Sequence, residues 1–242
     1  MRQAVGVIGG VGPMATVYYM QRVIEMTKAG CDQDHINMLV FNDCDIPDRT
    51  AFITEQSSNN PLPVMVEDAK RLEAAGCDFV VIPCNTAHYF YDELQQAVQI
   101  PVVNIVEETI RYAKARIPDL QTVGIMATTG TIVTGTYQTY AERAGLTSVI
   151  PDEEGQAALM HMIYDGVKAG QPVSRAEFDA VADALRAQGA GCLILGCTEL
   201  SVLKRDLPID DPDVLDSIDV LASETVRRSG KPATSECLQC VP

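Results

Sequence analysis

The 242-residue sequence lacks any long hydrophobic run. A transmembrane helix needs about 18 or more consecutive apolar residues, and no such stretch is present. The short apolar run near the N-terminus ends at Gly9 and Gly10, and it lacks the length and the small-residue cleavage site of a signal peptide. We therefore expect a cytoplasmic protein with no membrane partner.

Positive charge is scarce as well. The chain has 18 Lys and Arg residues against 33 Asp and Glu residues, which gives a formal net charge of −15. This balance makes nucleic acid and anionic membrane surfaces poor partners. It also repels an acidic ligand at long range, so a site for such a ligand needs cations close by.

The sequence lacks a clear cofactor or metal motif. The glycine cluster at residues 9–13 does not have the spacing G-x-G-x-x-G, and Pro13 removes a backbone N–H that would hold phosphate. The pair Cys237 and Cys240 has no second pair, which makes it weak evidence for zinc. We expect no cofactor and no metal, and we expect residues 233–242 to form a flexible tail.

Cysteine, in contrast, is plentiful. The chain has eight cysteines and no sign of export, so free thiols are expected. Four of them fall within or beside apolar runs, where a thiol behaves as a small buried hydrophobe. These four are Cys31, Cys44, Cys77 and Cys192.

Short apolar runs alternate with helical patterns along the chain. The predicted strands are residues 4–8, 35–42, 79–82, 102–106, 122–126, 148–150 and 192–195. The predicted helices are residues 15–28, 62–75, 175–188 and 219–228. Continuous apolar runs of this length are typical of strands buried on both faces of a parallel sheet, so the alternation predicts an α/β fold.

The chain also repeats itself. Residues 72–86 resemble residues 185–199, and each copy has a helix end, a glycine stop, an apolar strand and then a cysteine in a polar turn. We therefore predict two similar domains with mostly parallel sheets, related by a pseudo-two-fold axis. Ligands bind at the carboxyl ends of parallel strands, so Cys84 and Cys197 are expected to face each other across an active-site cleft. The predicted domains are residues 1–102 plus 214–232, and residues 103–213.

These cysteine turns carry a family resemblance. Residues 83–88 and 196–200 together resemble the aspartate/glutamate racemase superfamily, most closely its aspartate racemase branch. Further similar stretches are residues 9–16, 46–50, 127–131, 137–138 and 164–168. Val11 departs from the pattern, where Met is expected. The resemblance implies two α/β domains around a cleft, a homodimer and no cofactor.

Two thiols suit the racemisation of an amino acid. Inverting an α-carbon requires removal of a proton from one face and its return to the other, which two opposed acid/base groups do directly. The reference pKa of a thiol, about 8.5, allows either role once tuned. Cys84 and Cys197 are the predicted catalytic pair, one a thiolate and the other a thiol. They should titrate as a coupled system.

Other residues are assigned by the resemblance. Donors that bind the substrate and stabilise its developing negative charge are predicted at Asn85, Thr86, Thr129, Gly130, Thr131 and Thr198. Arg49 and Lys168 are predicted to reach the substrate carboxylates, with ordinary surface cations as the alternative. His88 and Glu199 are candidate auxiliary groups. A structural histidine and a helix cap or ion pair are the alternatives.

The predicted function is cofactor-independent conversion of L-aspartate to D-aspartate. Glutamate racemase and broad-specificity amino-acid racemase stay open, because one methylene in a pocket is worth only about 1–3 kcal/mol. Hydantoin racemase and maleate isomerase are further members of the superfamily. Arg49 and Lys168 favour a substrate with an acidic side chain, so hydantoin racemase is disfavoured. A small-ligand-binding α/β module and a thiol-disulfide oxidoreductase are the alternatives outside the superfamily.

Overall fold

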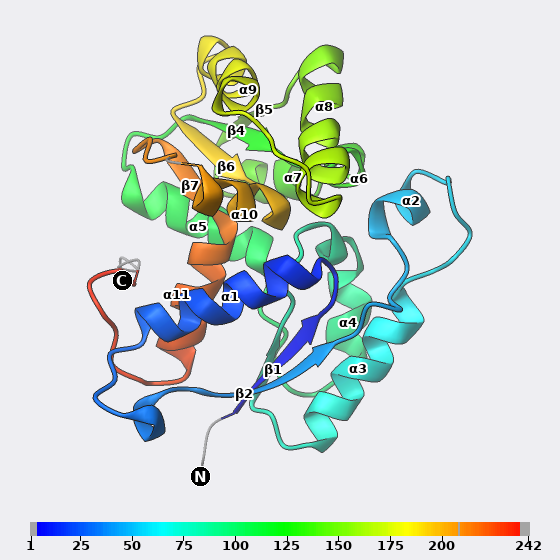
Figure 1. Ribbon diagram of the computed structural model, residues 1–242, viewed down its shortest axis with the longest axis vertical. Helices are drawn as coiled ribbons and strands as arrows, with labels where there is room; N and C mark the ends of the chain where they lie inside the picture. Colours follow the sequence, from blue (N-terminus) through cyan, green and yellow to red (C-terminus); the bar gives the residue numbers. More distant parts are fainter. Residues whose placement is uncertain (1–3, 208, 238–242) are drawn as a thin grey trace.

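The computed structural model describes residues 4–207 and 209–237, which form an α/β fold with two parallel sheets (Figure 1). The strand order is β2-β1-β3 in the first sheet and β5-β4-β6-β7 in the second. The strands are β1 (Ala4–Gly9), β2 (Asn37–Asn42), β3 (Phe79–Val81), β4 (Thr122–Met126), β5 (Thr147–Val149), β6 (Cys192–Leu195) and β7 (Val214–Asp216). The predicted fold class is confirmed.

Helices follow the strands, and local sequence signals fix several of their ends. The α-helices are α1 (Pro13–Met26), α2 (Arg49–Ile53), α3 (Leu62–Ala74), α4 (Tyr91–Ala97), α5 (Ile105–Arg116), α6 (Thr129–Val133), α7 (Thr136–Arg143), α8 (Glu153–Met160), α9 (Arg175–Ala187), α10 (Thr198–Asp206) and α11 (Ser217–Arg228). The other helices are the 3-10 helices η1 (Asp32–Asp34) and η2 (Thr86–Phe90) and the π-helix η3 (His161–Lys168). Ser174 and Glu177 form the predicted capping box of α9.

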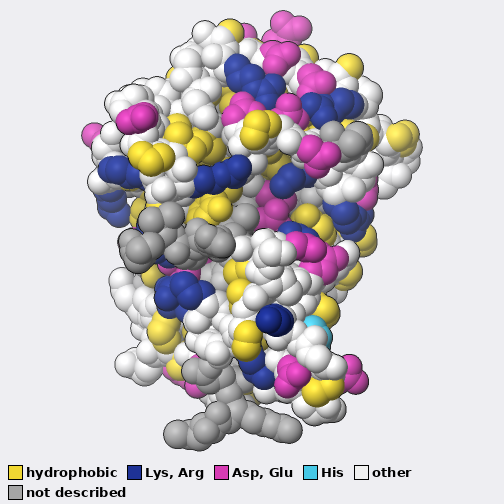
Figure 2. All heavy atoms as spheres, turned by 90° about the vertical axis from the view of Figure 1, so that its left-hand side faces the viewer, with side chains coloured by type: hydrophobic (Ala, Val, Ile, Leu, Met, Phe, Trp, Pro, Cys, Tyr) yellow, Lys and Arg dark blue, Asp and Glu magenta, His cyan; other side chains and the backbone are white. Residues whose placement is uncertain are grey.

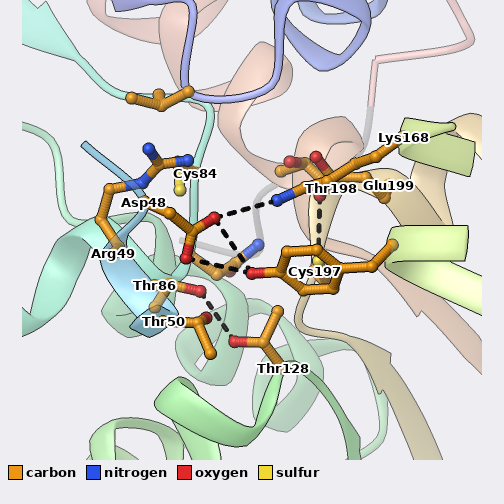
Figure 3. Close-up of a pocket in the computed structure, with 13 residues that line it drawn as sticks. Asp48, Arg49, Thr50, Cys84, Thr86, Thr128, Lys168, Cys197, Thr198 and Glu199 are labelled. Carbon is orange, nitrogen blue, oxygen red and sulfur yellow. Dashed lines mark hydrogen bonds and ion pairs between the residues drawn. The ribbon is translucent and has the colours of Figure 1, made fainter. Parts of the chain in front are cut away.

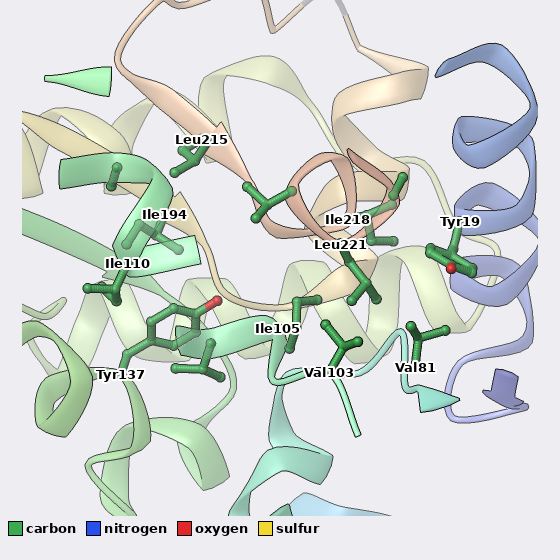
Figure 4. Packing of buried hydrophobic residues seen from close by; sticks show 14 of the residues in the cluster. Tyr19, Val81, Val103, Ile105, Ile110, Tyr137, Ile194, Leu215, Ile218 and Leu221 are labelled. Atoms are coloured by element: carbon green, nitrogen blue, oxygen red, sulfur yellow. The ribbon is translucent and has the colours of Figure 1, made fainter. Parts of the chain in front are cut away.

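One buried cluster joins the two halves. Val81 of β3 contributes from the first sheet and Ile194 of β6 from the second, together with residues of α1, α5 and α11 (Figure 4). Helix α5 contacts α7 of the second half, and α11 contacts α1 of the first half. Because each of these helices continues from one sheet and packs on elements of the other half, the two sheets share a core.

The two halves have matching topology. The match includes residues 102–106, where the sequence patterns predicted a strand. The predicted strand at residues 102–106 is wrong beyond Val102, which forms a single parallel bridge with Val80. Helix α5 begins at Ile105 because the Asn104 side chain accepts hydrogen bonds from two backbone N–H groups of its first turn. In the second half the equivalent position is the full strand β7, followed by α11.

Strand β7 also corrects the predicted division into domains. Residues 214–232 were expected to belong with the first half, yet β7 pairs with β6 in the second sheet. Three residues, Val-Leu-Asp, are too short a run for periodicity to identify as a strand. The remainder of the proposed division stays a prediction.

The end of the chain is packed as far as the structure describes it. The predicted flexible tail is wrong for residues 233–237, because Ala233 bridges Thr27 and the Thr234 backbone N–H donates to the Met26 carbonyl. Cys240 lies outside the described residues. Among the cysteines expected in the core, Cys77 and Cys192 are buried. Two others, Cys31 and Cys44, are exposed, contrary to expectation, because they lie in polar connections beyond the apolar runs.

The surface matches the acidic composition. On the face shown in Figure 2, Lys and Arg side chains lie beside Asp and Glu side chains, so this face has no continuous basic area. Within residues 4–207 and 209–237, no helix is long and apolar enough to cross a membrane.

One buried carboxyl group should make stability depend on pH. Asp216 caps α11 and is almost fully buried, and burial, with Asp219 nearby, raises its pKa above the ordinary value. Its Oδ2 atom has no hydrogen-bond partner among the described residues and lies 3.9 Å from Lys204 Nζ. Because the folded state holds this proton more tightly than the unfolded chain does, Asp216 loses its favourable contribution as pH rises through the raised pKa.

We therefore expect the Asp216→Asn variant to gain thermal stability relative to wild type on going from about pH 4 to about pH 8. Asparagine keeps the capping oxygen but never becomes charged. Differential scanning fluorimetry at both pH values measures the change in Tm. Asp152→Asn is the matched control, because Asp152 caps α8 but is exposed. An equal Tm difference at both pH values for Asp216→Asn would contradict the prediction.

Candidate active site

Two buried cysteines line one pocket from equivalent turns. Cys84 follows β3 and Cys197 follows β6, and both lie in the wall of the same pocket between the two halves (Figure 3). Only 6% of Cys84 and 4% of Cys197 is exposed. Helix η2 starts at Thr86 and α10 starts at Thr198, so backbone N–H groups at two helix starts lie beside the thiols. The predicted juxtaposition of the two turns is present in the structure.

Glu199 is the hydrogen-bond partner of Cys197. The thiol donates to the Glu199 carboxylate, with 3.0 Å between Sγ and Oε2. Burial, reinforced by the charge of Glu199, raises the pKa of Cys197 well above its ordinary value. Gly12 makes this arrangement possible, because a Cβ atom there would lie 2.5 Å from Glu199 Oε1. The Cys197 side of the pocket therefore favours a neutral thiol.

Arg49 lies on the Cys84 side. Its Nη1 donates to the carbonyls of Ile46 and Pro47, at 3.3 and 2.8 Å. Burial opposes the charged form, but the neighbouring Cys84 and Asp48 raise the pKa of Arg49. Its Nε atom is buried and has no hydrogen-bond partner within the described part of the chain. The guanidinium thus places positive charge beside Cys84, and its Nε donor is unused among the described residues.

Asp48 ties the two halves together across the pocket. It caps α2 by accepting from the Ala51 N–H at 2.8 Å, and it accepts from the Tyr164 hydroxyl at 3.1 Å. Lys168 Nζ lies 3.5 Å from the same carboxylate. Burial opposes the charge of Lys168, but Glu199 and other neighbours raise its pKa. Two cations and two anions therefore balance one another in the pocket.

The walls meet closely around the thiols. The free volume of the pocket is about 10 Å³, close to that of a single water molecule and too small for an amino acid. A second hollow of about 340 Å³ shares four of its walls, namely Asp48, Arg49, Lys168 and Glu199. It continues past the glycine turn before α1 and past Cys44. An amino acid can therefore bind at the thiols only if the pocket widens.

Three predicted substrate ligands do not reach the pocket wall. Thr129 donates its N–H to Met160 Sδ, while its hydroxyl accepts from Gln156. Gly130 lies against α2, where an added Cβ would come within 3.0 Å of Thr50. The Thr131 hydroxyl bonds to those of Thr86 and Thr128. The helix α6 turn therefore packs against the first half, and Thr128 is its residue in the pocket wall.

His88 supports the Cys84 turn through the backbone. Its Nε2 accepts from the Ile105 N–H at 3.2 Å, which leaves Nδ1 to donate to the Cys84 carbonyl at 2.8 Å. Burial lowers the pKa of His88, so the ring is neutral. It contacts the carbonyl of Cys84 and therefore holds the turn in place.

The pocket wall also contains residues that the sequence analysis did not assign to the site. The predicted residues in its wall are Arg49, Cys84, Asn85, Thr86, Lys168, Cys197, Thr198 and Glu199. The additional ones are Val11, Asp48, Thr50, Thr128 and Tyr164. Each of these lies within a stretch that carries the family resemblance. The spacing of four residues between Tyr164 and Lys168 could have indicated Tyr164, because residues four apart share a helix face.

Metal ligands are not grouped here. Across residues 4–207 and 209–237, no three His, Cys, Asp or Glu side chains are placed to hold a metal ion.

Comparison with known proteins identifies the family. The family pattern of Asp/Glu/Hydantoin racemases matches residues 8–225. The chain belongs to this family. It is 30% identical over 232 residues to the broad specificity amino-acid racemase RacX of Bacillus subtilis, covering 92% of this chain and 96% of RacX. It is 26% identical to the glutamate racemase of Corynebacterium glutamicum, covering 72% of this chain and 66% of that enzyme.

A solved structure agrees with this assignment. Picrophilus torridus aspartate racemase superimposes with a TM-score of 0.85 and 30% identity, covering 99% of this chain and 100% of that one. The chain is thus a member of an amino-acid racemase family, and its two-sheet fold matches that of a racemase. These likenesses include aspartate, glutamate and broad-specificity enzymes, so the substrate has to be argued from the pocket.

The Glu199–Cys197 contact gives a direct prediction. Glu199→Gln keeps an oxygen that accepts from the thiol but removes the negative charge, so the pKa of Cys197 should fall, while burial still holds it above the ordinary value. Titration of the ultraviolet absorbance of thiolate should then show extra thiolate at lower pH than in wild type. The same change in a Cys197→Ser background should have no effect. A shift in that background would assign the signal to another cysteine.

Proposed function

We propose that this chain racemises an acidic amino acid, converting L-aspartate to D-aspartate, with Cys84 and Cys197 as opposed acid/base groups. The observation that carries the proposal is the placement of two buried thiols in one pocket, each after an equivalent strand of two matching halves. Non-catalytic ligand binding does not require two such thiols. Because the cysteines come from separate turns, a C-x-x-C redox centre fits this pocket poorly.

The charges around the thiols support different resting states. Cys84 lies beside the Arg49 guanidinium and is proposed to be the thiolate, while Cys197 donates to Glu199 and is proposed to be the thiol. By family resemblance, Cys84 takes the α-proton of the D-enantiomer and Cys197 that of the L-enantiomer. The resting form, with Cys84 as thiolate and Cys197 as thiol, is the form that inverts the D-enantiomer. Conversion of the L-enantiomer needs the opposite form, with the proton on Cys84 and Cys197 as thiolate. In each direction the thiolate receives the α-proton from one face and the thiol returns a proton to the opposite face.

The α-proton of an amino acid is weakly acidic, so the developing charge needs donors. Backbone N–H groups at the starts of η2 and α10, with the side chains of Asn85, Thr86 and Thr198, are proposed to bind the reacting carboxylate. These groups are buried and held before the substrate binds. This preorganisation is proposed to replace the electron sink that a cofactor provides, and we propose that the reaction uses no cofactor and no metal.

The preference for an acidic side chain rests on the cations. Arg49 has an unused buried N–H, and Lys168 is paired with Asp48, so a substrate carboxylate could engage both. The larger hollow beyond these residues favours a second candidate, a broader range that includes glutamate, since a longer side chain would extend into it. A cytoplasmic homodimer is proposed from the family resemblance.

Incubation in D₂O tests the proposal. Pure protein dialysed against chelator should place deuterium at Cα of aspartate and form both enantiomers, as measured by NMR and chiral chromatography. Cys84→Ser and Cys197→Ser should each abolish inversion, because a serine hydroxyl is a far poorer base near neutral pH. Cys197→Ser should still exchange the α-proton of D-aspartate. Cys84→Ser should still exchange that of L-aspartate at a pH high enough for the Cys197 thiolate to form.

The outcomes separate the alternatives. Exchange of the opposite enantiomers would reverse the assignment of faces, and unchanged inversion in either variant would rule out the two-thiol mechanism. Exchange of glutamate or neutral amino acids at the same rate as aspartate would favour the broader range. Activity lost on dialysis against chelator would point to a metal.

Arg49→Lys tests the proposed recognition of the acidic substrate. Lysine keeps the charge but loses the planar fork, so kcat/KM for aspartate should fall about tenfold or more, equivalent to one charge-assisted hydrogen bond. Thermal stability should change far less. Arg71→Lys on the exposed face of α3 is the matched control and should leave the kinetics unchanged. Unchanged kinetics with lowered stability for Arg49→Lys would make Arg49 a structural residue.

A further inference from the structure

Tyr137 of α7 connects the two cysteine turns. Its side chain is fully buried, and its ring packs on Gly196, the residue before Cys197. A Cβ atom at Gly196 would lie 2.9 Å from Tyr137 Cε2, so only glycine leaves room for the ring. Its hydroxyl donates to Asn85 Oδ1 at 2.6 Å, and Asn85 directly follows Cys84. One side chain thus touches the neighbours of both thiols.

Ser217 makes a second connection between the same turns. Asn85 Nδ2 donates to Ser217 Oγ at 2.9 Å, and Ser217 Oγ donates to the Leu195 carbonyl at 2.7 Å. Leu195 ends β6, two residues before Cys197. Asn85 and Ser217 are both buried, so these bonds are not exchanged for water.

We propose that Tyr137 and Ser217 are positioning residues that fix the two thiols relative to each other, by clamping Asn85 to the Cys197 turn. The inference rests on the proposed function, because it assigns the clamp to a reaction that needs both sulfurs. The Tyr137 hydroxyl is the hydrogen-bond partner of Asn85 Oδ1, and Ser217 Oγ accepts one hydrogen of Asn85 Nδ2. The second hydrogen of Nδ2 stays available to the pocket wall, with its direction fixed by the clamp.

A positioning role has a consequence that a purely structural role does not have. Inversion needs both sulfurs aligned on opposite faces of one carbon, whereas exchange of the α-proton on a single face needs only one. A displacement of about 1 Å can reduce a rate about a hundredfold. Loosening the clamp should therefore impair inversion more than single-face exchange.

The test compares two buried tyrosines that each lose a hydroxyl. Tyr137→Phe removes the bond to Asn85, and Tyr19→Phe removes an equivalent buried bond of 2.7 Å to Thr225 in the core, away from the pocket. With L-aspartate in D₂O, kcat for inversion should fall about tenfold or more in Tyr137→Phe, with KM little changed. The amount of deuterium in the recovered L-aspartate, relative to the amount of D-aspartate formed, should rise. Tyr19→Phe should lower Tm similarly and leave that ratio as in wild type.

A second variant keeps the test decisive if Tyr137→Phe does not fold. Ser217→Ala breaks the other half of the clamp and should raise the exchange-to-inversion ratio in the same direction. If wild type is active and the exchange-to-inversion ratio of the variant that folds equals that of wild type, the clamp is overturned and the proposed function is not. A wild type that neither inverts nor exchanges any amino acid would overturn the proposed function, and the clamp with it.

Discussion

Two sulfurs share one buried pocket, and the charged side chains beside them are opposite in sign. Two thiolates in a low-dielectric site would repel each other strongly. The chain places a cation, Arg49, beside Cys84 and an anion, Glu199, on Cys197. The halves are therefore alike in backbone but opposite in local charge. A pair of identical surroundings would leave the location of the proton undetermined.

The pocket is less acidic than the chain as a whole, as the proposed acidic substrate requires. The chain carries a net charge of −15, yet Lys168 and Arg49 face Asp48 and Glu199 within the pocket, so the local balance is close to neutral. Because Asp48 caps α2 and Lys168 ends η3, their ion pair holds the two sides together. A bound carboxylate that replaces Asp48 as the partner of Lys168 would exchange one ion pair for another, at little cost in Coulomb energy.

The sequence was informative where structure is local. Six of the seven predicted apolar strands, the capping box at Ser174 and Glu177, and the repeated cysteine turns depend on neighbouring residues, and they were predicted correctly. Strand β7 was missed because three residues give no periodicity, and its identity depends on pairing with β6. Thr129 and Thr131 lie outside the pocket wall, which the sequence could not indicate for a similar reason. Which face of the α6 turn meets the pocket depends on Gly130 packing against Thr50.

Connections between the halves are what the sequence patterns could not show. Helix α5 continues from the first sheet but contacts α7, and α11 continues from the second sheet but contacts α1. This exchange brings Ser217, at the start of α11, beside Asn85 of the first half. Neither residue has a sequence neighbour that indicates the contact. The distance between the two thiols is therefore set by the packing of the crossed helices as well as by the turns that carry the cysteines.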